Sequence, residues 1–242
     1  MLNRISIVLF SVVFGGCSLS DEPKDGFYIV NYTVNFSQSM DSWAVDFADY
    51  PASEGDSVKY ALKTDVTSMP ASTNLAGNGL FVTGNNANAD LFMFLKRKVG
   101  GLNPNTDYTI VFDVTLASNA PTGLFDGNAA YSPGQGVYLK VGAVVNEPMK
   151  VVRGDYYRMN IDKGNNGDSG SDMITIGDIG VAPATKDFTI VTRSNSTVNT
   201  PIVVRTNGSG ELWLIVGTDS VFQGATDLYY SKIDVVFSAN NQ

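Results

Sequence analysis

The sequence predicts an all-β protein whose strands form an antiparallel, jelly-roll-like β-sandwich. Three observations lead to this prediction. Aromatic and β-branched residues alternate with polar ones along many short runs, which is the period of a half-buried strand. Clusters of Asn, Gly, Pro and Asp separate these runs, as expected of turns. Helical periodicity is missing, so the pattern favours packed sheets over a parallel sheet with crossover helices.

The first element along the chain is an N-terminal secretion signal. One basic residue precedes an apolar run over residues 5–14, which is far shorter than the roughly 20 residues of a membrane-spanning helix. Two glycines then lead to Cys17, and a lipoprotein signal peptidase requires small residues at these positions. The pattern resembles a lipobox, with Phe14 where Leu is usual. We expect residues 1–16 to be a cleaved lipoprotein signal peptide and Cys17 to become the lipid-bearing first residue.

Lipid attachment fits the cysteine content of the chain. Cys17 is the only cysteine, so a disulfide framework is impossible and the thiol is free to form a thioether. Ser18 follows it rather than Asp, which resembles an outer-membrane sorting signal. Residues 17–25 are polar and include Pro23, as expected of a short tether. The lipid predicts a protein held at a membrane of the bacterial cell envelope, and the sorting signal indicates the outer membrane.

Residues 26–242 are predicted to form a single β-sandwich domain. Hydrophobic residues make up 43% of the chain, which is enough to fill a core. Cleavage leaves 15 basic residues (16 less Arg4) against 24 acidic ones, a net charge of −9. Such a surface repels phosphate backbones, so nucleic acid is not an expected partner. The chain has no histidine, which excludes Ser-His-Asp and Cys-His nucleophile systems and the usual zinc ligands.

Strand-like runs follow one another through this domain. They cover residues 27–36, 79–83, 91–99, 108–116, 137–145, 156–161, 173–179, 188–193, 202–206, 212–217 and 228–237. Residues 99–108 place a Pro-Asn turn between two of these strands, with Tyr108 able to close the corner. This corner resembles those of jelly-roll carbohydrate-binding modules and fibronectin-type sandwiches. Residues 228–237 look like the closing strand of such a jelly roll.

Four phrases carry a wider resemblance. They read ADYP at residues 48–51, LFMFLKR at 91–97, MNIDKGN at 159–165 and LWLIVGTDS at 212–220. These phrases resemble a family of uncharacterised secreted bacterial proteins and lipoproteins with a jelly-roll domain like that of carbohydrate-binding modules. The resemblance covers most of the mature chain and implies an extracytoplasmic location, but no known activity. The family has a Gly and a Glu where this chain has Val221 and Gln223.

The polar loop at residues 162–172, called the acidic loop below, is a candidate calcium site. Calcium takes six to eight oxygen ligands, and the loop offers carboxylates, amides and glycines that let carbonyls turn inward. It is not an EF-hand, because Gly164 and Met173 stand where that motif needs ligands. The alternative is a solvated hairpin turn, since Asp, Asn and Gly dominate turns. We predict structural calcium and no organic cofactor, with the ligands Asp162, Asn165, Asp168 and Asp172.

Aromatic residues beside polar ones are candidates for glycan binding, because sugar rings stack their C–H faces on Trp and Tyr. Trp43 follows a polar stretch, Tyr50 comes soon after it, and Tyr131 lies in a loop rich in Gly and Asn. Asp219 adds a carboxylate able to bind hydroxyl groups. These four residues are the predicted ligand contacts. Trp213, in a run that is apolar on both faces, is expected in the core instead.

The predicted function is that of a membrane-anchored, extracytoplasmic lipoprotein whose non-catalytic sandwich binds a glycan. Two alternatives stay open. A structural or assembly lipoprotein would bind another envelope protein through a continuous apolar patch. A glycoside hydrolase would need two carboxylates flanking the bond, and no spacing in the sequence selects such a pair.

Overall fold

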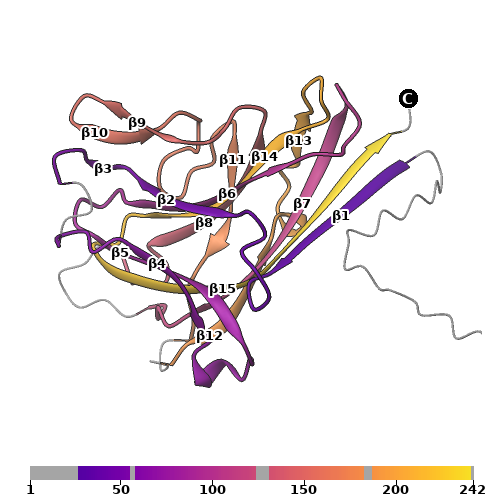
Figure 1. Cartoon of the computed structure of the whole chain (residues 1–242). Helices are drawn as coiled ribbons and strands as arrows, with labels where there is room; N and C mark the ends of the chain where they lie inside the picture. Colours follow the sequence, from indigo (N-terminus) through magenta and orange to yellow (C-terminus); the bar gives the residue numbers. More distant parts are fainter. Residues whose placement is uncertain (1–26, 55–57, 124–130, 183–186, 241–242) are drawn as a thin grey trace, which may run out of the picture.

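The computed structural model describes residues 27–54, 58–123, 131–182 and 187–240 and confirms the predicted all-β fold class. Two antiparallel sheets pack face to face as a jelly-roll-like sandwich, and a small third sheet lies beside them (Figure 1). Cys17 and the predicted signal peptide lie outside the described residues. Within these residues, no helix has the length and apolar character needed to cross a membrane.

The larger sheet has seven strands and is built around the long strand β15. Its main path runs in the order β12 (Thr189–Ser194), β7 (Asp107–Ser118), β15 (Gly224–Asn240), β5 (Asn78–Asn86) and β4 (Lys63–Ser68). Two further strands, β1 (Phe27–Asn35) and β13 (Ile202–Arg205), pair with β15 and β7 respectively. β15 has 17 residues, so β5 and β1 pair with successive halves of it.

The second sheet has five strands, and the small third sheet has three. The five-stranded sheet runs in the order β11 (Met173–Asp178), β8 (Val137–Val144), β14 (Leu212–Ser220), β6 (Phe92–Val99) and β2 (Ala44–Ala48). The third sheet joins β3 (Tyr50–Pro51), β10 (Tyr156–Met159) and β9 (Lys150–Arg153). Two single-turn 3-10 helices complete the described elements, η1 (Ala71–Thr73) and η2 (Asn195–Thr197).

The main core lies between the two large sheets. Along β7, alternate side chains from Tyr108 to Leu116 are completely buried, because successive side chains of a strand point to opposite faces. From the other sheet, Leu214 and Val216 of β14 meet them in the same apolar cluster. The period-two pattern therefore identified the buried face correctly.

The corner after β6 confirms the role expected of Tyr108. Its hydroxyl accepts a hydrogen bond from the backbone N–H of Asn103, at 3.0 Å. Asn105 adopts a left-handed backbone conformation with φ of 50°, which asparagine tolerates better than most residues. This contact fixes the turn that leads into β7.

Four strands were not predicted: β2, β3, β4 and β9. All four lie at the edges of their sheets, and β4 shows only one residue that is not exposed. An edge strand buries little side-chain area, so its sequence lacks a hydrophobic period.

The ends of the strands define the two ends of the sandwich. Phe27, the start of β1, pairs with Asn240 at the end of β15 (Figure 1). The start of β15, Gly224, lies only a few residues after the end of β14 at Ser220. The chain therefore enters the domain at one end, and β14 finishes at the opposite end.

Candidate functional site

The outer face of the five-stranded sheet, which points away from the main core, is covered by residues 145–172. We call this stretch the covering segment; it contains β9, β10 and the acidic loop. Two glycines of the sheet allow its close approach. A Cβ atom at Gly142 would lie 2.1 Å from the carbonyl oxygen of Asp172, and one at Gly217 would lie 2.7 Å from the ring of Phe92. Side chains at these positions would displace the covering segment and its supporting ring.

A second apolar cluster holds one part of the covering segment to the sheet. Met159 and Ile161 from the segment pack against residues of the outer face. Their partners are Ala48, Phe92, Phe94, Met173 and Ile215. The rings of Phe92 and Phe94 stack with centroids 5.4 Å apart. Burial of these side chains stabilises the position of the segment.

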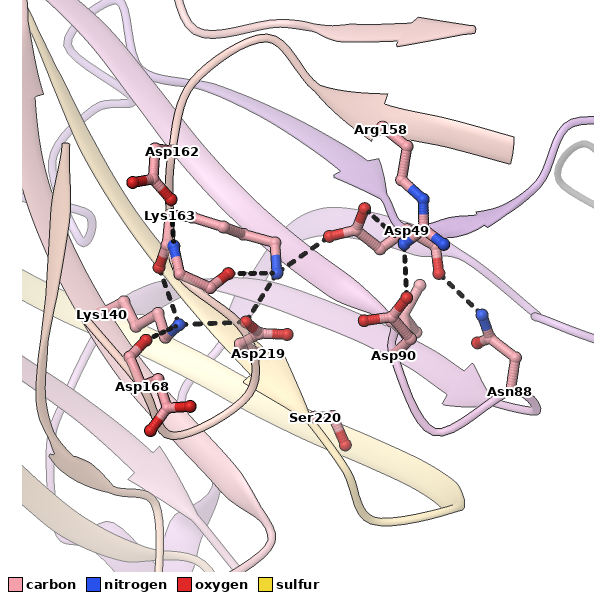
Figure 2. Close-up of polar contacts among 12 residues, drawn as sticks. Asp49, Asn88, Asp90, Lys140, Arg158, Asp162, Lys163, Asp168, Asp219 and Ser220 are labelled. Atoms are coloured by element: carbon pink, nitrogen blue, oxygen red, sulfur yellow. Dashed lines mark hydrogen bonds and ion pairs between the residues drawn. The ribbon is translucent and has the colours of Figure 1, made fainter. Parts of the chain in front are cut away.

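A buried ionic network holds the next part, and its centre is Asp219 on β14. Figure 2 shows Lys140 of β8 and Lys163 of the acidic loop converging on this carboxylate, with Nζ–Oδ2 distances of 3.1 and 2.6 Å. Asp219 and Lys140 have no exposed side-chain surface. Lys140 also donates to the backbone carbonyls of Lys163 and Asp168, both at 2.8 Å. One ammonium group therefore ties the sheet to two points of the acidic loop.

The network continues toward the third sheet through Asp49. The Oδ2 atom of Asp49 lies 3.0 Å from Nζ of Lys163, and its Oδ1 atom accepts a hydrogen bond from Arg158 of β10 at 3.0 Å. Arg158 also pairs with Asp90. Asn88 donates to the backbone carbonyl of Asp49 at 2.9 Å (Figure 2). Three carboxylates and three cationic groups thus balance one another, as buried charges require.

Burial and neighbouring charges shift the pKa values of these groups in different directions. Burial raises the pKa of Asp219 and lowers the pKa of the Lys140 ammonium group. Burial also opposes the charge of Lys163, but Asp219 and Asp49 outweigh it, so the pKa of Lys163 is raised. Removal of any one charge would leave an unbalanced buried partner. The network is suited to fixing the covering segment rather than to binding a ligand from solvent.

The four predicted calcium ligands have protein partners in the acidic loop. The carboxylate of Asp162 accepts the backbone N–H groups of Gly164 and Ser171, at 3.0 and 2.9 Å, and these bonds lower its pKa. The carboxylate of Asp172 accepts the backbone N–H of Asp162 at 2.7 Å. The other two predicted ligands make contacts through their backbone carbonyl groups. The Asn165 carbonyl accepts a hydrogen bond from the backbone N–H of Asp168 at 2.9 Å, and the Asp168 carbonyl accepts one from the ammonium group of Lys140 on β8.

Hydrogen bonds within the protein therefore explain why the acidic loop is rich in Asp and Gly. Carboxylates cap its backbone N–H groups, and an ammonium group occupies the position where two carbonyls turn inward. In the part of the chain that the structure describes, no three Asp, Glu, His or Cys side chains are grouped in a way that could hold a metal ion. Calcium binding by the loop stays a prediction.

The four predicted ligand contacts do not lie together. Trp43 and Tyr50 are only 4% and 1% exposed, so the expectation that their rings face a ligand is not met. The indole N–H of Trp43 donates to the hydroxyl of Tyr32 at 3.2 Å, and the Tyr50 ring packs 5.4 Å from that of Tyr60. Asp219 lies in the buried network. Burial of these side chains depends on contacts distant in sequence, which the polar neighbours of Trp43 do not indicate.

Trp213 also departs from its prediction, because it is not in the core. It stands on the outer face of the five-stranded sheet and is only partly buried. The Lys96 ammonium group lies 5.7 Å from the centre of its ring. The strand is apolar on both faces because the second cluster covers its neighbour Ile215.

Tyr131, the fourth predicted ligand contact, is exposed and belongs to a group of aromatic side chains that we call the aromatic edge. Its exposed fraction is 42%. A Cβ atom at Gly136 would lie 2.8 Å from Cβ of Tyr131 and 2.9 Å from Cβ of Phe222, so these two side chains flank the same glycine. The third member, Tyr138, points outward from β8. Both Tyr138 and Phe222 are partly buried.

Polar groups surround the aromatic edge. The pKa of the Tyr138 hydroxyl is raised by burial and by its neighbours Tyr131, Asp178 and Asp168, and Asp178 is the strand-pairing partner of Tyr138. The Tyr138 ring also lies against Gly167 of the acidic loop, whose Cβ position is 3.0 Å from ring carbons. The sequence analysis missed Tyr138, although its strand alternation with Val137 and Leu139 could have indicated an outward side chain.

Comparisons with known proteins show similarity to solved β-sandwich structures. No protein-family model matches the sequence, and no curated protein matches it. Caldicellulosiruptor saccharolyticus CBM27-1 in complex with mannohexaose matches with a TM-score of 0.39 and 12% identity, over 84% of this chain and 95% of that one. The family 11 carbohydrate-binding module of a Clostridium thermocellum cellulosomal cellulase matches with 0.38 and 10%, over 85% and 93%. The enzymatically active domain of bacteriophage CBA120 tailspike protein 4 matches with 0.35 and 8%, over 81% and 20%. These values are too low to assign a function.

Proposed function

We propose that this protein is a lipid-anchored lipoprotein of the bacterial cell envelope whose sandwich binds a glycan at the aromatic edge without catalysing a reaction. The observation that carries the proposal is the exposed ring of Tyr131 next to Tyr138, with Asp168 and Asp178 near Tyr138. Aromatic rings supply contact area for the C–H faces of a sugar. Carboxylates accept hydrogen bonds from its hydroxyl groups, a division of roles usual in small-ligand sites.

The buried network supports this proposal because it fixes one side of the aromatic edge. Lys140 holds the carbonyl of Asp168, and Gly167 lies against the ring of Tyr138. A loop that is already ordered loses little conformational entropy when a ligand binds. The network therefore contributes to affinity through preorganisation and not through contact with the glycan.

The pairing of the buried carboxylates favours binding over glycoside hydrolysis. The most deeply buried carboxylates, Asp219 and Asp49, are both paired with lysine and point into the protein, so they are not available to act on a bond. A non-catalytic binding role does not need a free carboxylate pair.

The glycan proposal predicts that Tyr131→Ala together with Tyr138→Ala weakens binding at least about tenfold, equivalent to about 1.4 kcal/mol. The measurement is a glycan array on residues 26–242, followed by titration calorimetry with the best ligand. Tyr156→Ala is the matched control. Tyr156 is partly buried on β10, where Arg158 lies 4.6 Å above its ring, and its loss should leave the affinity unchanged.

Equal affinity of the double variant and the wild type would refute the site. Absence of any bound glycan at millimolar concentration would favour a structural role with an envelope-protein partner.

The proposed anchor predicts that Cys17→Ser moves the protein from the membrane fraction to the soluble fraction, because no acyl chain is attached. Fractionation with and without detergent measures this directly, and Ser18→Ala serves as the control that keeps the thiol. Continued membrane association of Cys17→Ser would contradict the lipid. In the proposed arrangement the anchor enters beside Phe27, at the end of the sandwich opposite to Ser220 and the aromatic edge. The edge would thus face away from the membrane.

A further inference from the structure

The outer face of the seven-stranded sheet carries a second aromatic surface that the proposed function does not use. Strand pairing places five residues in one row across five strands, and we call them the aromatic row. In order they are Asp65, Phe81, Tyr229, Ala117 and Ile190. Their inward neighbours, including Leu80, Leu116 and Leu228, belong to the main core, so the row points to the opposite side.

The rings in the row form a continuous patch. Phe81 and Tyr229 have centroids 4.7 Å apart at an angle of 40°, and the ring of Phe188 meets Tyr229 edge-on at 5.0 Å. All three are partly exposed. Ala117 has no exposed surface, because its small side chain lies below its larger neighbours. Five strands at about 4.8 Å spacing make the row roughly 19 Å long.

Most of the polar groups beside the row are hydroxyls and carboxylates. Thr83 donates to Asp227 at 2.5 Å on one side, and Thr115 and Thr192 share a hydrogen bond of 3.2 Å on the other. Asp65 ends the row and is exposed. The nearby Lys232 is already paired with Asp234 at 2.7 Å. One further cation, Lys63, lies opposite Thr83 and is exposed. Asp65 and Asp227 stand beside it, so a negatively charged partner would meet carboxylates next to the rings as well as this lysine.

We propose that the aromatic row is a second binding surface, for an uncharged polysaccharide lying across the strands. Such a chain offers C–H faces to Phe81 and Tyr229, and its hydroxyl groups meet the threonines and carboxylates on both sides. The row lies on the seven-stranded sheet and the aromatic edge on the five-stranded one. The two surfaces can therefore hold separate chains, and simultaneous binding raises avidity toward an insoluble polysaccharide.

The test is cosedimentation of the soluble domain with insoluble cellulose, chitin and β-mannan. Phe81→Ala together with Tyr229→Ala should reduce the bound fraction at least about tenfold on the polysaccharide that the wild type binds. Phe188→Ala, which removes a ring at the border and keeps the other two, should cause a smaller loss. Circular dichroism and melting curves show whether each variant is folded. Carboxymethylated cellulose, a soluble chain with negative charges, should compete more weakly for the domain in this assay than uncharged soluble hydroxyethyl cellulose.

The tyrosine variants of the aromatic edge separate this proposal from the first one. Tyr131→Ala with Tyr138→Ala should retain binding through the row, and the Phe81/Tyr229 variant should retain soluble-glycan binding at the edge. Unchanged sedimentation of the folded Phe81/Tyr229 and Phe188 variants would overturn the second surface. The same conclusion follows if the wild type sediments with none of the three polysaccharides, whatever the result at the edge.

Discussion

Replacing Asp219 by asparagine is expected to lower the free energy of unfolding by about 3–5 kcal/mol, the usual cost of breaking a buried ion pair. The Asp219 carboxylate is completely buried and forms ion pairs with the ammonium groups of both Lys140 and Lys163. Asparagine keeps the shape but removes the charge, so two ammonium groups remain in the interior with only Asp49 to balance them. Chemical denaturation in urea measures the change, provided that the slope of the transition is unchanged.

A matched control and a double variant make the Asp219 prediction specific. Asp178→Asn removes a carboxylate whose side chain is 34% exposed and which pairs with Arg193 at 3.3 Å, so its effect should stay within about 1 kcal/mol. Combining Asp219→Asn with Lys163→Met should cost less than the sum of the two single losses, because the second change removes a charge that the first left unbalanced. Additive losses, or equal losses for Asp219 and Asp178, would contradict the network.

Replacing Gly142 by alanine is expected to destabilise the domain by about 1–3 kcal/mol, as overpacking of a close contact does. The new Cβ atom would lie 2.1 Å from the carbonyl oxygen of Asp172 and 2.8 Å from Cγ of Met173. Neither the loop backbone nor β11 can stay in place. Thermal melting measures the loss, and limited proteolysis should cleave the acidic loop faster than in the wild type.

Gly100→Ala is the control for the Gly142 prediction. A Cβ atom there would make one ordinary contact, 3.6 Å from Cγ of Glu211, and the change should stay within about 0.5 kcal/mol. A Gly142→Ala variant as stable and protease-resistant as Gly100→Ala would show that the covering segment does not rest on the sheet at this point.

The fold was predictable from the sequence because long strands such as β7 show a clear alternation. From Tyr108 to Leu116 each inward residue of β7 is large and apolar, and most outward ones are Thr or Asp, so strand and buried face follow from the same pattern. β4 and β9 could not be found in this way, since they lie at sheet edges and bury little. Their existence depends on a neighbouring strand and not on their own composition.

The site was predictable only in part. Tyr131, one of the four predicted ligand contacts, is exposed. The acidic loop was identified from its composition as a candidate calcium site, with a solvated hairpin turn as the alternative. The roles of Lys140 and Lys163 could not be predicted, because their partner Asp219 lies 79 and 56 residues away in the sequence, respectively. A lysine in a strand is ordinarily exposed. Only the covering segment, which turns the outer face of the sheet into an interior, makes these two side chains buried partners.

The pairing of β1 with β15 determines how the domain resists mechanical force. Nine consecutive residues of β1 pair with β15, from Phe27 opposite Asn240 to Asn35 opposite Lys232. Suppose that force is applied to the chain just before Phe27 while the opposite end of the sandwich is held by a ligand. The force then acts along the axis of β1. The backbone hydrogen bonds of this ladder are then loaded together in shear, and they cannot be opened one at a time as in peeling. A tension applied through the tether would therefore be spread over the whole strand before the sandwich could begin to unravel.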